Sequence, residues 1–108
     1  MNESKYCIVY VTVSSEEEGR KVAEAVVGKK IAACANMIGP IRSLYWWKGA
    51  VQDDPEMLLI MKTSTDMFER LREAVLEAHS YEVPEIIAAP IIAGHPPYLD
   101  WIGESVEK

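Results

Sequence analysis

The sequence predicts an α+β fold, and three observations support this prediction. Segments rich in β-branched and aromatic residues alternate with amphipathic segments of helical period, in the order strand, helix, strand, strand, helix, strand, with a further helix at the end. Hydrophobic residues make up 49% of the chain, which is ordinary for a globular protein and argues against disorder. A length of 108 residues suits one domain, so we expect residues 1–108 to form a single unit.

Charge and targeting signals narrow the classes of partner. The net charge of −6 comes without a basic patch, so a phosphate backbone would be repelled and nucleic acid is a poor partner. No apolar run reaches membrane-spanning length, and Met1 to Lys5 do not resemble a signal peptide. We therefore expect a cytoplasmic protein without a membrane partner. Cys7 and Cys34 lie inside strand-like runs, which indicates reduced thiols.

The first strand and the first helix have clear boundaries. Residues 5–13 contain neither Gly nor Pro and predict a strand that is apolar on both faces. Ser15 and Glu18 match a capping box, so the helix should begin there. Gly28 is well placed to end it.

A long hairpin is predicted next. Residues 31–47 favour a strand that is interrupted by a bend or bulge at Gly39-Pro40. Lys48-Gly49 is the expected turn, and residues 50–63 form the return strand, with an irregularity of their own at Asp53-Asp54-Pro55. Alternatively, Asp53-Asp54-Pro55 makes the hairpin a wide loop.

The second half of the chain repeats the alternation of helix and strand. Thr65 and Asp66 are candidate N-caps for a second helix that runs to about His79. Residues 82–92 supply the last core strand, in which Pro90 indicates an edge or bulge position. Residues 98–103 predict a short closing helix with an aromatic face.

This order of elements, with right-handed crossovers, gives the split βαβ arrangement of ferredoxin-like domains. Met57 to Met61 are apolar at consecutive positions, so the return strand should be covered on both sides. One layer of two helices covers only one face of a sheet. The other face needs a cover, and another copy of the chain would supply it.

Residues 79–86 (HSYEVPEI), called the elbow below, combine one histidine, two carboxylates and a phenol between the second helix and the last strand. Pro84 removes a backbone donor and favours an extended Val83. Two interpretations stay open: the wall of a site, or a helix end followed by an anchored strand start.

Four stretches resemble the CutA family of divalent-cation tolerance proteins, and the resemblance covers nearly the whole chain. Residues 31–38 (IAACANMI) are similar to the family's Ala-Ala-Cys-x-Asn strand, and residues 43–49 (SLYWWKG) to its Tyr-x-Trp-x-Gly hairpin. The elbow differs from the family's His-Pro-Tyr-Glu-Val-Pro-Glu-Ile only in Ser80. Residues 98–101 (YLDW) match its closing helix.

The resemblance implies a ferredoxin-like subunit in a tight homotrimer like that of PII-type signalling proteins, with long hairpin arms that pair between subunits. It also implies a role in tolerance of copper and other divalent cations, with copper or another divalent cation as the bound metal. No glycine-rich phosphate loop, triad order or arginine cluster is present in the sequence, so we expect no enzyme.

Copper favours thiolate and imidazole ligands, with carboxylate as a further donor, and the candidates here are Cys7, Cys34, His79, His95, Glu82 and Glu85. Of these, we expect His79 and Cys34 to be the metal ligands. Family members credited with copper binding carry a cysteine near the end of the first strand and a second histidine before that of the elbow. Val11 and Ala78 occupy the matching positions, which leaves only His79 of that set. A small apolar residue would explain Cys34 equally well, because its neighbours are Ala and Ile.

A second candidate site is a cleft between subunits. Its predicted wall contains Asn36, Tyr45, Trp47, Lys62, Tyr81 and Glu82. Lys62 ends an apolar strand, where its ammonium needs a carboxylate such as Glu56 or Glu82, or an anionic ligand. The alternative function is therefore a PII-like signalling protein that binds a small anion through Lys62 and Tyr81.

Overall fold

The computed structural model describes residues 4–107, which form a four-stranded antiparallel sheet and three α-helices. The sheet has the order β2-β3-β1-β4. The strands are β1 (Tyr6–Val13), β2 (Cys34–Trp47), β3 (Ala50–Ser64) and β4 (Ile86–Pro90). The helices are α1 (Glu16–Gly28), α2 (Phe68–Ala78) and α3 (Pro96–Ser105), with a 3₁₀ turn η1 (Thr65–Met67) before α2.

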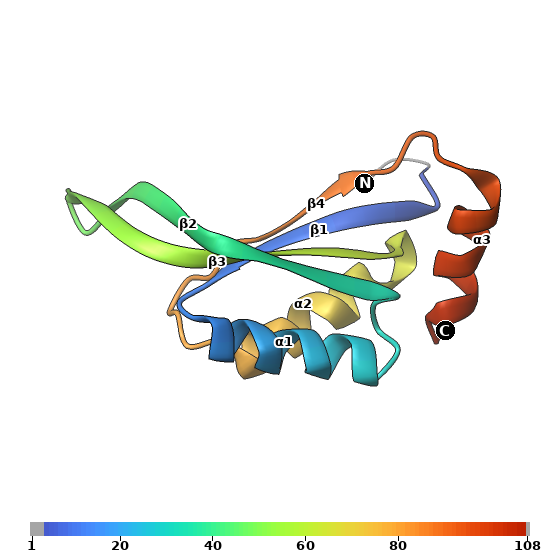
Figure 1. Ribbon diagram of the computed structural model, residues 1–108, viewed down its shortest axis with the longest axis horizontal. Coiled ribbons are helices and arrows are strands. Elements are labelled where there is room, and N and C mark those ends of the chain that lie inside the picture. Colours follow the sequence, from blue (N-terminus) through green and yellow to red (C-terminus); the bar gives the residue numbers. More distant parts are fainter. Residues whose placement is uncertain (1–3, 108) are drawn as a thin grey trace.

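Both long helices cover the same face of the sheet. Figure 1 shows α1 and α2 side by side beneath the strands, α3 at one end, and the β2–β3 hairpin projecting from the other. The hairpin gives the molecule its elongated shape, with extents of 43 × 25 × 22 Å. The predicted α+β class and the order of the elements are confirmed.

The core lies between the sheet and the two helices. Residues of β1 alternate between half-buried and fully buried, which is the period of a strand packed on one face. Val9 and Val11 pair with Met61 and Leu59 of β3, and all four are fully buried. The helices contribute Val22, Val26, Leu71 and Val75 to the same cluster.

The opposite face of the sheet, called the open face below, is apolar too. Pairing places Ile8 and Tyr10 of β1 next to Lys62 and Ile60 of β3, and Ile60 next to Asn36 of β2. Neither α1 nor α2 lies on this face, and α3 contacts the sheet only at one end, where Tyr98 approaches Cys34 opposite Lys62. Ile38 and Ile87 on this face are 46% and 54% exposed. The prediction of a sheet with two apolar faces is therefore confirmed.

The first helix begins where the capping box predicts, but the second hydrogen bond of the box has a different partner. The Ser15 hydroxyl accepts a hydrogen bond from the Glu18 backbone N–H at 3.1 Å. The Glu18 carboxylate bonds to Ser14 instead of returning to Ser15. The helix ends at Gly28, and the left-handed residue that turns the chain is Lys30, with φ of 59°.

The hairpin turn lies at Lys48-Gly49, as predicted. Both residues have positive φ, 52° and 79°, which is the conformation of a type I′ turn. The bulge at Gly39-Pro40 is also confirmed, since the register shifts between Ile38 and Ile41. The alternative wide loop at Asp53-Asp54-Pro55 is wrong, and so is the irregularity predicted there, because these residues pair in register with residues 42–44.

Three predicted boundaries differ from the structure. The second strand begins at Cys34 instead of residue 31, because the backbone N–H groups of Ile31 and Ala32 bond to Val26 at the end of α1. The α2 helix follows a 3₁₀ turn and has no side-chain cap, so Thr65 and Asp66 are not its N-caps. The β4 strand is confined to Ile86–Pro90.

The closing helix is longer than predicted. It begins at Pro96, where a fixed φ suits the first helical turn, and it extends to Ser105. None of the helices in residues 4–107 is long and apolar enough to cross a membrane.

Candidate functional site

The His79 ring fastens the elbow to the end of β1. Its Nε2 lies 2.7 Å from the Thr12 carbonyl oxygen, and its Nδ1 accepts a hydrogen bond of 3.1 Å from the Tyr81 backbone N–H. A carbonyl only accepts, so Nε2 carries the proton and Nδ1 is free of one. Both ring nitrogens are therefore occupied by backbone groups.

Glu18 fastens the same segment to the start of α1. One carboxylate oxygen accepts hydrogen bonds of 2.9 Å from the backbone N–H and the hydroxyl of Ser14, and the other accepts one of 2.7 Å from the Ser80 N–H. Burial alone would raise the pKa of Glu18, but the hydrogen bonds from Ser80 and Ser14 outweigh it and lower this pKa to about 2. The elbow is thus held through an ionised carboxylate.

Tyr81 connects the elbow to the hairpin. Its hydroxyl donates a hydrogen bond of 2.7 Å to Glu56, a β3 residue that is only 6% exposed. Burial, this hydrogen bond and the negative charge of Glu56 raise the pKa of Tyr81 above its usual range. The β2–β3 hairpin beyond the bulge, residues 41–56, is called the arm below. A buried carboxylate and a neutral phenol therefore form a hydrogen bond where the arm leaves the sheet.

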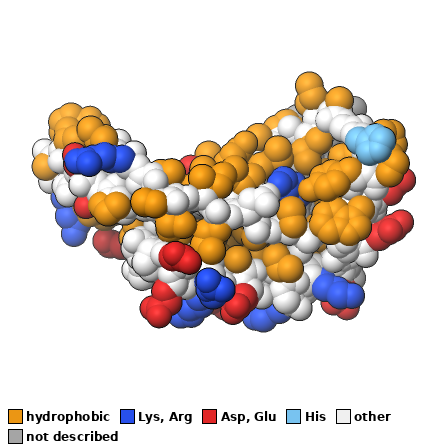
Figure 2. Space-filling model, viewed as in Figure 1, with side chains coloured by type: hydrophobic (Ala, Val, Ile, Leu, Met, Phe, Trp, Pro, Cys, Tyr) orange, Lys and Arg blue, Asp and Glu red, His pale blue; other side chains and the backbone are white. Residues whose placement is uncertain are grey.

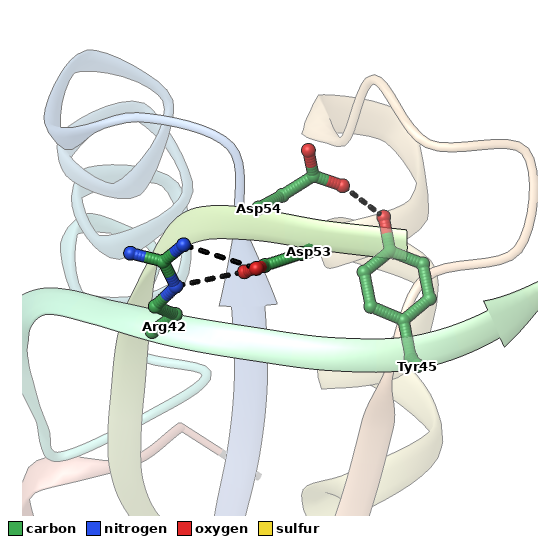
Figure 3. Close-up of polar contacts among 4 residues, drawn as sticks. All are labelled: Arg42, Tyr45, Asp53 and Asp54. Carbon is green, nitrogen blue, oxygen red and sulfur yellow. Dashed lines mark hydrogen bonds and ion pairs between the residues drawn. The ribbon is translucent and has the colours of Figure 1, made fainter. Parts of the chain in front are cut away.

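Two cross-strand contacts stiffen the base of the arm, as Figure 3 shows. The Arg42 guanidinium donates hydrogen bonds of 2.8 and 3.0 Å to the two carboxylate oxygens of Asp53. The Tyr45 hydroxyl donates one of 2.7 Å to Asp54. Because its bonding is bidentate, the positive charge of Arg42 is matched by Asp53, which lies diagonally across the strand pair, since Arg42 is opposite Pro55 and Asp53 is opposite Leu44.

A cavity of about 830 Å³ lies between the arm and the elbow. Its wall includes four aromatic residues, three carboxylates and one guanidinium. These are Tyr45, Trp46, Trp47, Tyr81, Glu56, Glu82, Glu85 and Arg42. The cavity brings together Tyr45, Trp47, Tyr81 and Glu82 of the residues predicted for a ligand cleft.

The remaining predicted cleft residues lie elsewhere, on the open face. Cys34 pairs with Lys62 across β2 and β3, and the Lys62 ammonium donates a hydrogen bond to the side-chain oxygen of Asn36. Neither Glu56 nor Glu82 is the partner of Lys62 among the described residues. The predicted carboxylate contact of Lys62 is replaced by an amide.

Cys34 lies close to α3. Its sulfur is 4.0 Å from the Tyr98 hydroxyl oxygen, and the Tyr98 ring packs on Trp101 with centroids 5.4 Å apart. The thiol is half-buried and free, whereas Cys7 is buried in the core. Burial and the neighbouring Cys34 raise the pKa of Tyr98.

The two predicted metal ligands lie far apart within one chain. Cys34 is opposite Lys62, which is opposite Ile8, whereas His79 bonds to Thr12 further along β1. At about 3.3 Å per residue and about 4.8 Å per strand, this separation exceeds about 15 Å. Residues 4–107 contain no group of three or more His, Cys, Asp and Glu side chains that could hold a metal ion.

Two hydrogen bonds that hold the elbow were not predicted from the sequence. The bond from Glu18 to Ser80 joins residues 62 positions apart, and a capping motif carries no signal for so distant a partner. The pairing of Glu56 with Tyr81 spans 25 positions. A carboxylate directly before the apolar run Met57 to Met61 was the available signal for Glu56, because a buried charge requires a polar partner.

Comparison with known sequences gives a consistent result. The family described as "CutA1 divalent ion tolerance protein" matches residues 7–105. The divalent-cation tolerance protein CutA of Thermus thermophilus is 46% identical over 98 residues, which are 91% of this chain and 95% of the relative. The chloroplastic protein CutA 1 of rice, Oryza sativa, is 45% identical over 101 residues, or 94% of this chain, but the match spans only 57% of the rice protein.

Solved structures agree with the sequence comparison. The crystal structure of CutA1 from Oryza sativa superimposes with a TM-score of 0.94 at 43% identity and covers 97% of this chain and 96% of that one. The Thermus thermophilus divalent cation tolerance protein gives a TM-score of 0.92 at 44% identity and covers 94% and 99% of the two chains. Nearly the whole length of the chain thus shares its fold with these proteins.

Proposed function

Because this chain belongs to the CutA1 divalent ion tolerance family, we propose that it acts in tolerance of divalent cations by binding them, without catalysing a reaction. The observation that carries the proposal is the match of the family along residues 7–105. The Thermus thermophilus relative is named a divalent-cation tolerance protein, and the name of neither relative states an enzyme activity. Copper or a similar divalent cation is the proposed ligand, since a thiol and an imidazole are the soft and borderline donors available.

We propose that the functional unit is a homotrimer of single-domain, ferredoxin-like subunits. The strand order β2-β3-β1-β4 with two helices on one face supports this topology. The exposed apolar residues of the open face, such as Ile38 and Ile87, support assembly because neither α1 nor α2 covers this face in residues 4–107. We propose a cytoplasmic location as well, although the rice relative is named chloroplastic.

Cys34 and His79 are the proposed metal-binding positions, and each would act separately within a chain because they are far apart. The half-buried thiol of Cys34 is free to bind a metal as thiolate. His79 would bind through Nδ1 only by giving up the hydrogen bond from the Tyr81 N–H. We therefore expect weak binding, since each position supplies one strong donor.

The proposed ligand cleft is the cavity between the arm and the elbow, with Tyr45, Trp47, Tyr81 and Glu82 in its wall. The small-anion alternative finds less support, because the cavity carries carboxylates and Lys62 is bonded to Asn36 away from it. Asn36 and Lys62 remain proposed ligand residues of the open face, where a neighbouring subunit would complete their surroundings.

Isothermal titration with Cu²⁺ tests the metal proposal. We expect weak binding to the wild type, a partial loss in Cys34→Ser and in His79→Ala, and complete loss in the double variant. His95→Ala is the matched control, since His95 is an exposed histidine at the start of α3. Wild-type protein that binds no copper below millimolar concentration, or a double variant with an unchanged isotherm, would overturn the proposal.

A further inference from the structure

The backbone N–H of Tyr81 occupies the ring nitrogen of His79 that a metal ion would need. The Nε2–H of His79 donates to the Thr12 carbonyl oxygen at 2.7 Å, and a histidine that donates one ring N–H to a backbone carbonyl is oriented as metal-binding histidines are. This leaves Nδ1 as the ring nitrogen with a lone pair, and it accepts the Tyr81 N–H at 3.1 Å. The ring therefore suits a metal ion only after the Tyr81 N–H has moved away.

Two further hydrogen bonds hold that N–H in place, one on each side of it. The Ser80 N–H, one residue earlier, donates to a Glu18 carboxylate oxygen at 2.7 Å. The Tyr81 hydroxyl, on the side chain of the same residue, donates to Glu56 at 2.7 Å. The Tyr81 ring also packs on the His79 ring with centroids 4.7 Å apart. Turning the peptide between Ser80 and Tyr81 away from His79 would thus disturb several contacts at once.

Glu18 is a firm anchor for this peptide. Its second carboxylate oxygen accepts hydrogen bonds of 2.9 Å from the backbone N–H and the hydroxyl of Ser14, at the start of α1. Hydrogen bonds to an ionised carboxylate are stronger than bonds between neutral groups. All these contacts lie within one chain, so the arrangement does not depend on a neighbouring copy.

We propose that Glu18 and Ser80 lower the metal affinity of His79, because their hydrogen bond acts as a latch that keeps the Tyr81 N–H on Nδ1. The inference rests on the proposed binding of divalent metal ions at His79. Glu18 and Ser80 are positioning residues, since they act through the Tyr81 N–H and do not touch the metal. The direction of the effect is distinctive, because a carboxylate near a cation site would by Coulomb attraction raise its affinity.

Calorimetric titration of the full chain with Cu²⁺ tests the latch, in a Cys34→Ser background so that the proposed thiol position does not contribute. Adding Glu18→Gln should tighten copper binding about fivefold. A single amide oxygen cannot accept from both Ser14 and Ser80, and a larger population of the open elbow raises the apparent affinity of His79. Loss of Coulomb attraction alone would weaken the binding instead.

Ser80→Pro opens the same latch without changing any charge. Proline has no N–H to donate to Glu18, and His79 already has the extended backbone that a residue before proline requires, with φ of −92° and ψ of 143°. This variant should also tighten copper binding about fivefold. Adding His79→Ala to it should abolish the gain. Glu17→Gln is the matched control, since Glu17 is an exposed carboxylate in the same helical turn, and it should leave the affinity unchanged.

Hydrogen exchange of the Tyr81 amide, followed by NMR without metal, measures the opening directly. In the Cys34→Ser background, Ser80→Pro should speed this exchange about fivefold, by the same factor as the gain in copper affinity. An equal exchange rate with and without Ser80→Pro would overturn the inference, because the latch would then not hold the Tyr81 N–H.

The copper titrations separate this inference from the proposal on which it rests. If the Cys34→Ser chain binds copper through His79, but Glu18→Gln and Ser80→Pro bind it equally or more weakly, the latch is wrong and metal binding at His79 stands. If none of these chains binds copper below millimolar concentration, metal binding at His79 is wrong and the latch falls with it. A gain in affinity that survives His79→Ala would also overturn the latch, since another residue would then bind the copper.

Discussion

At the scale of single residues, two titratable side chains, Glu18 and His79, hold the elbow in place. The local sequence alone would assign them other roles, a helix cap for Glu18 and a helix end for His79. Glu18 belongs to a capping motif, yet its carboxylate also bonds to the Ser80 N–H. His79 follows the last residue of α2, yet its ring joins Thr12 to Tyr81. The elbow therefore follows the end of α2, and its residues 80–83 and 85 also line the cavity.

Glu18 makes stability depend on pH. Its pKa in the folded chain is about 2, below its ordinary value of 4.5, so its contribution is present above pH 4.5 and is lost as pH falls toward 2. Glu18→Gln should lower the free energy of unfolding at pH 7 by about 1–2 kcal/mol after allowance for solvent screening.

Urea unfolding at intervals from pH 7 to pH 2.5 measures this effect. The difference between wild type and Glu18→Gln should shrink through the acidic range. Glu17→Gln is the control, because Glu17 is exposed in the same helical turn and no hydrogen bond is found for its side chain among residues 4–107. A constant difference across the whole pH range would contradict the assignment.

Tyr81→Phe should destabilise the chain by about 1–3 kcal/mol, because it leaves the buried Glu56 carboxylate without its donor. Chemical unfolding at pH 7 measures the change. Tyr10→Phe serves as the control, since the half-buried Tyr10 hydroxyl donates no hydrogen bond within the described residues. Equal effects of the two substitutions would show that Glu56 does not depend on Tyr81.

The sequence predicts four of the residues that line the cavity, but it does not predict the contacts between residues far apart in the chain. Tyr45, Trp47, Tyr81 and Glu82 were expected together and line one cavity. Lys62 was expected with them, but register places it opposite Cys34, toward the other end of the sheet. Residue type predicts that a buried charge has a partner and does not predict which one.

At the scale of elements, the hairpin arm lines one side of the cavity along its length, from Glu56 near the sheet to Trp47 beside the turn. The type I′ turn at Lys48-Gly49 fixes the register of the arm, and the bulge at Gly39-Pro40 turns it away from the sheet. Both features follow from Gly and Pro, which is why they were predictable. The 3₁₀ turn before α2 was not, since Ser64, Thr65 and Asp66 all suit a cap.

Gly49→Ala should destabilise the hairpin by about 1 kcal/mol, because its φ of 79° is unfavourable for a residue with a side chain. A Cβ at this position meets no neighbouring atom, so the cost comes from the backbone alone. Gly28→Ala is the control, since it also meets no atom and sits at a helical residue. Thermal unfolding compares the two, and equal melting temperatures would contradict the prediction.

At the scale of the whole molecule, one face of the sheet determines how the chain can associate. Figure 2 shows hydrophobic side chains along the sheet and α3, whereas acidic and basic side chains gather along the lower edge over the helices. Apolar residues occupy the open face on all four strands, including Ile8, Ile38, Ile60 and Ile87. The sequence pattern predicted this second apolar face, and the proposed homotrimer would cover it.

Placing a charge on the open face should break the proposed assembly. Ile38→Glu introduces a carboxylate at a position that is 46% exposed in the single chain, so the subunit itself should still fold. We expect it to sediment as a monomer, while Val27→Glu, an exposed position on α1, keeps the wild-type mass. An Ile38→Glu variant with the wild-type mass would place the interface elsewhere.

Sedimentation equilibrium of the wild-type chain at micromolar concentration tests the central claim most directly, namely that copies of this chain complete its sheet and enclose its clefts. We expect a single species of three times the subunit mass of 12.1 kDa, independent of concentration. A stable monomer of 12.1 kDa would contradict it.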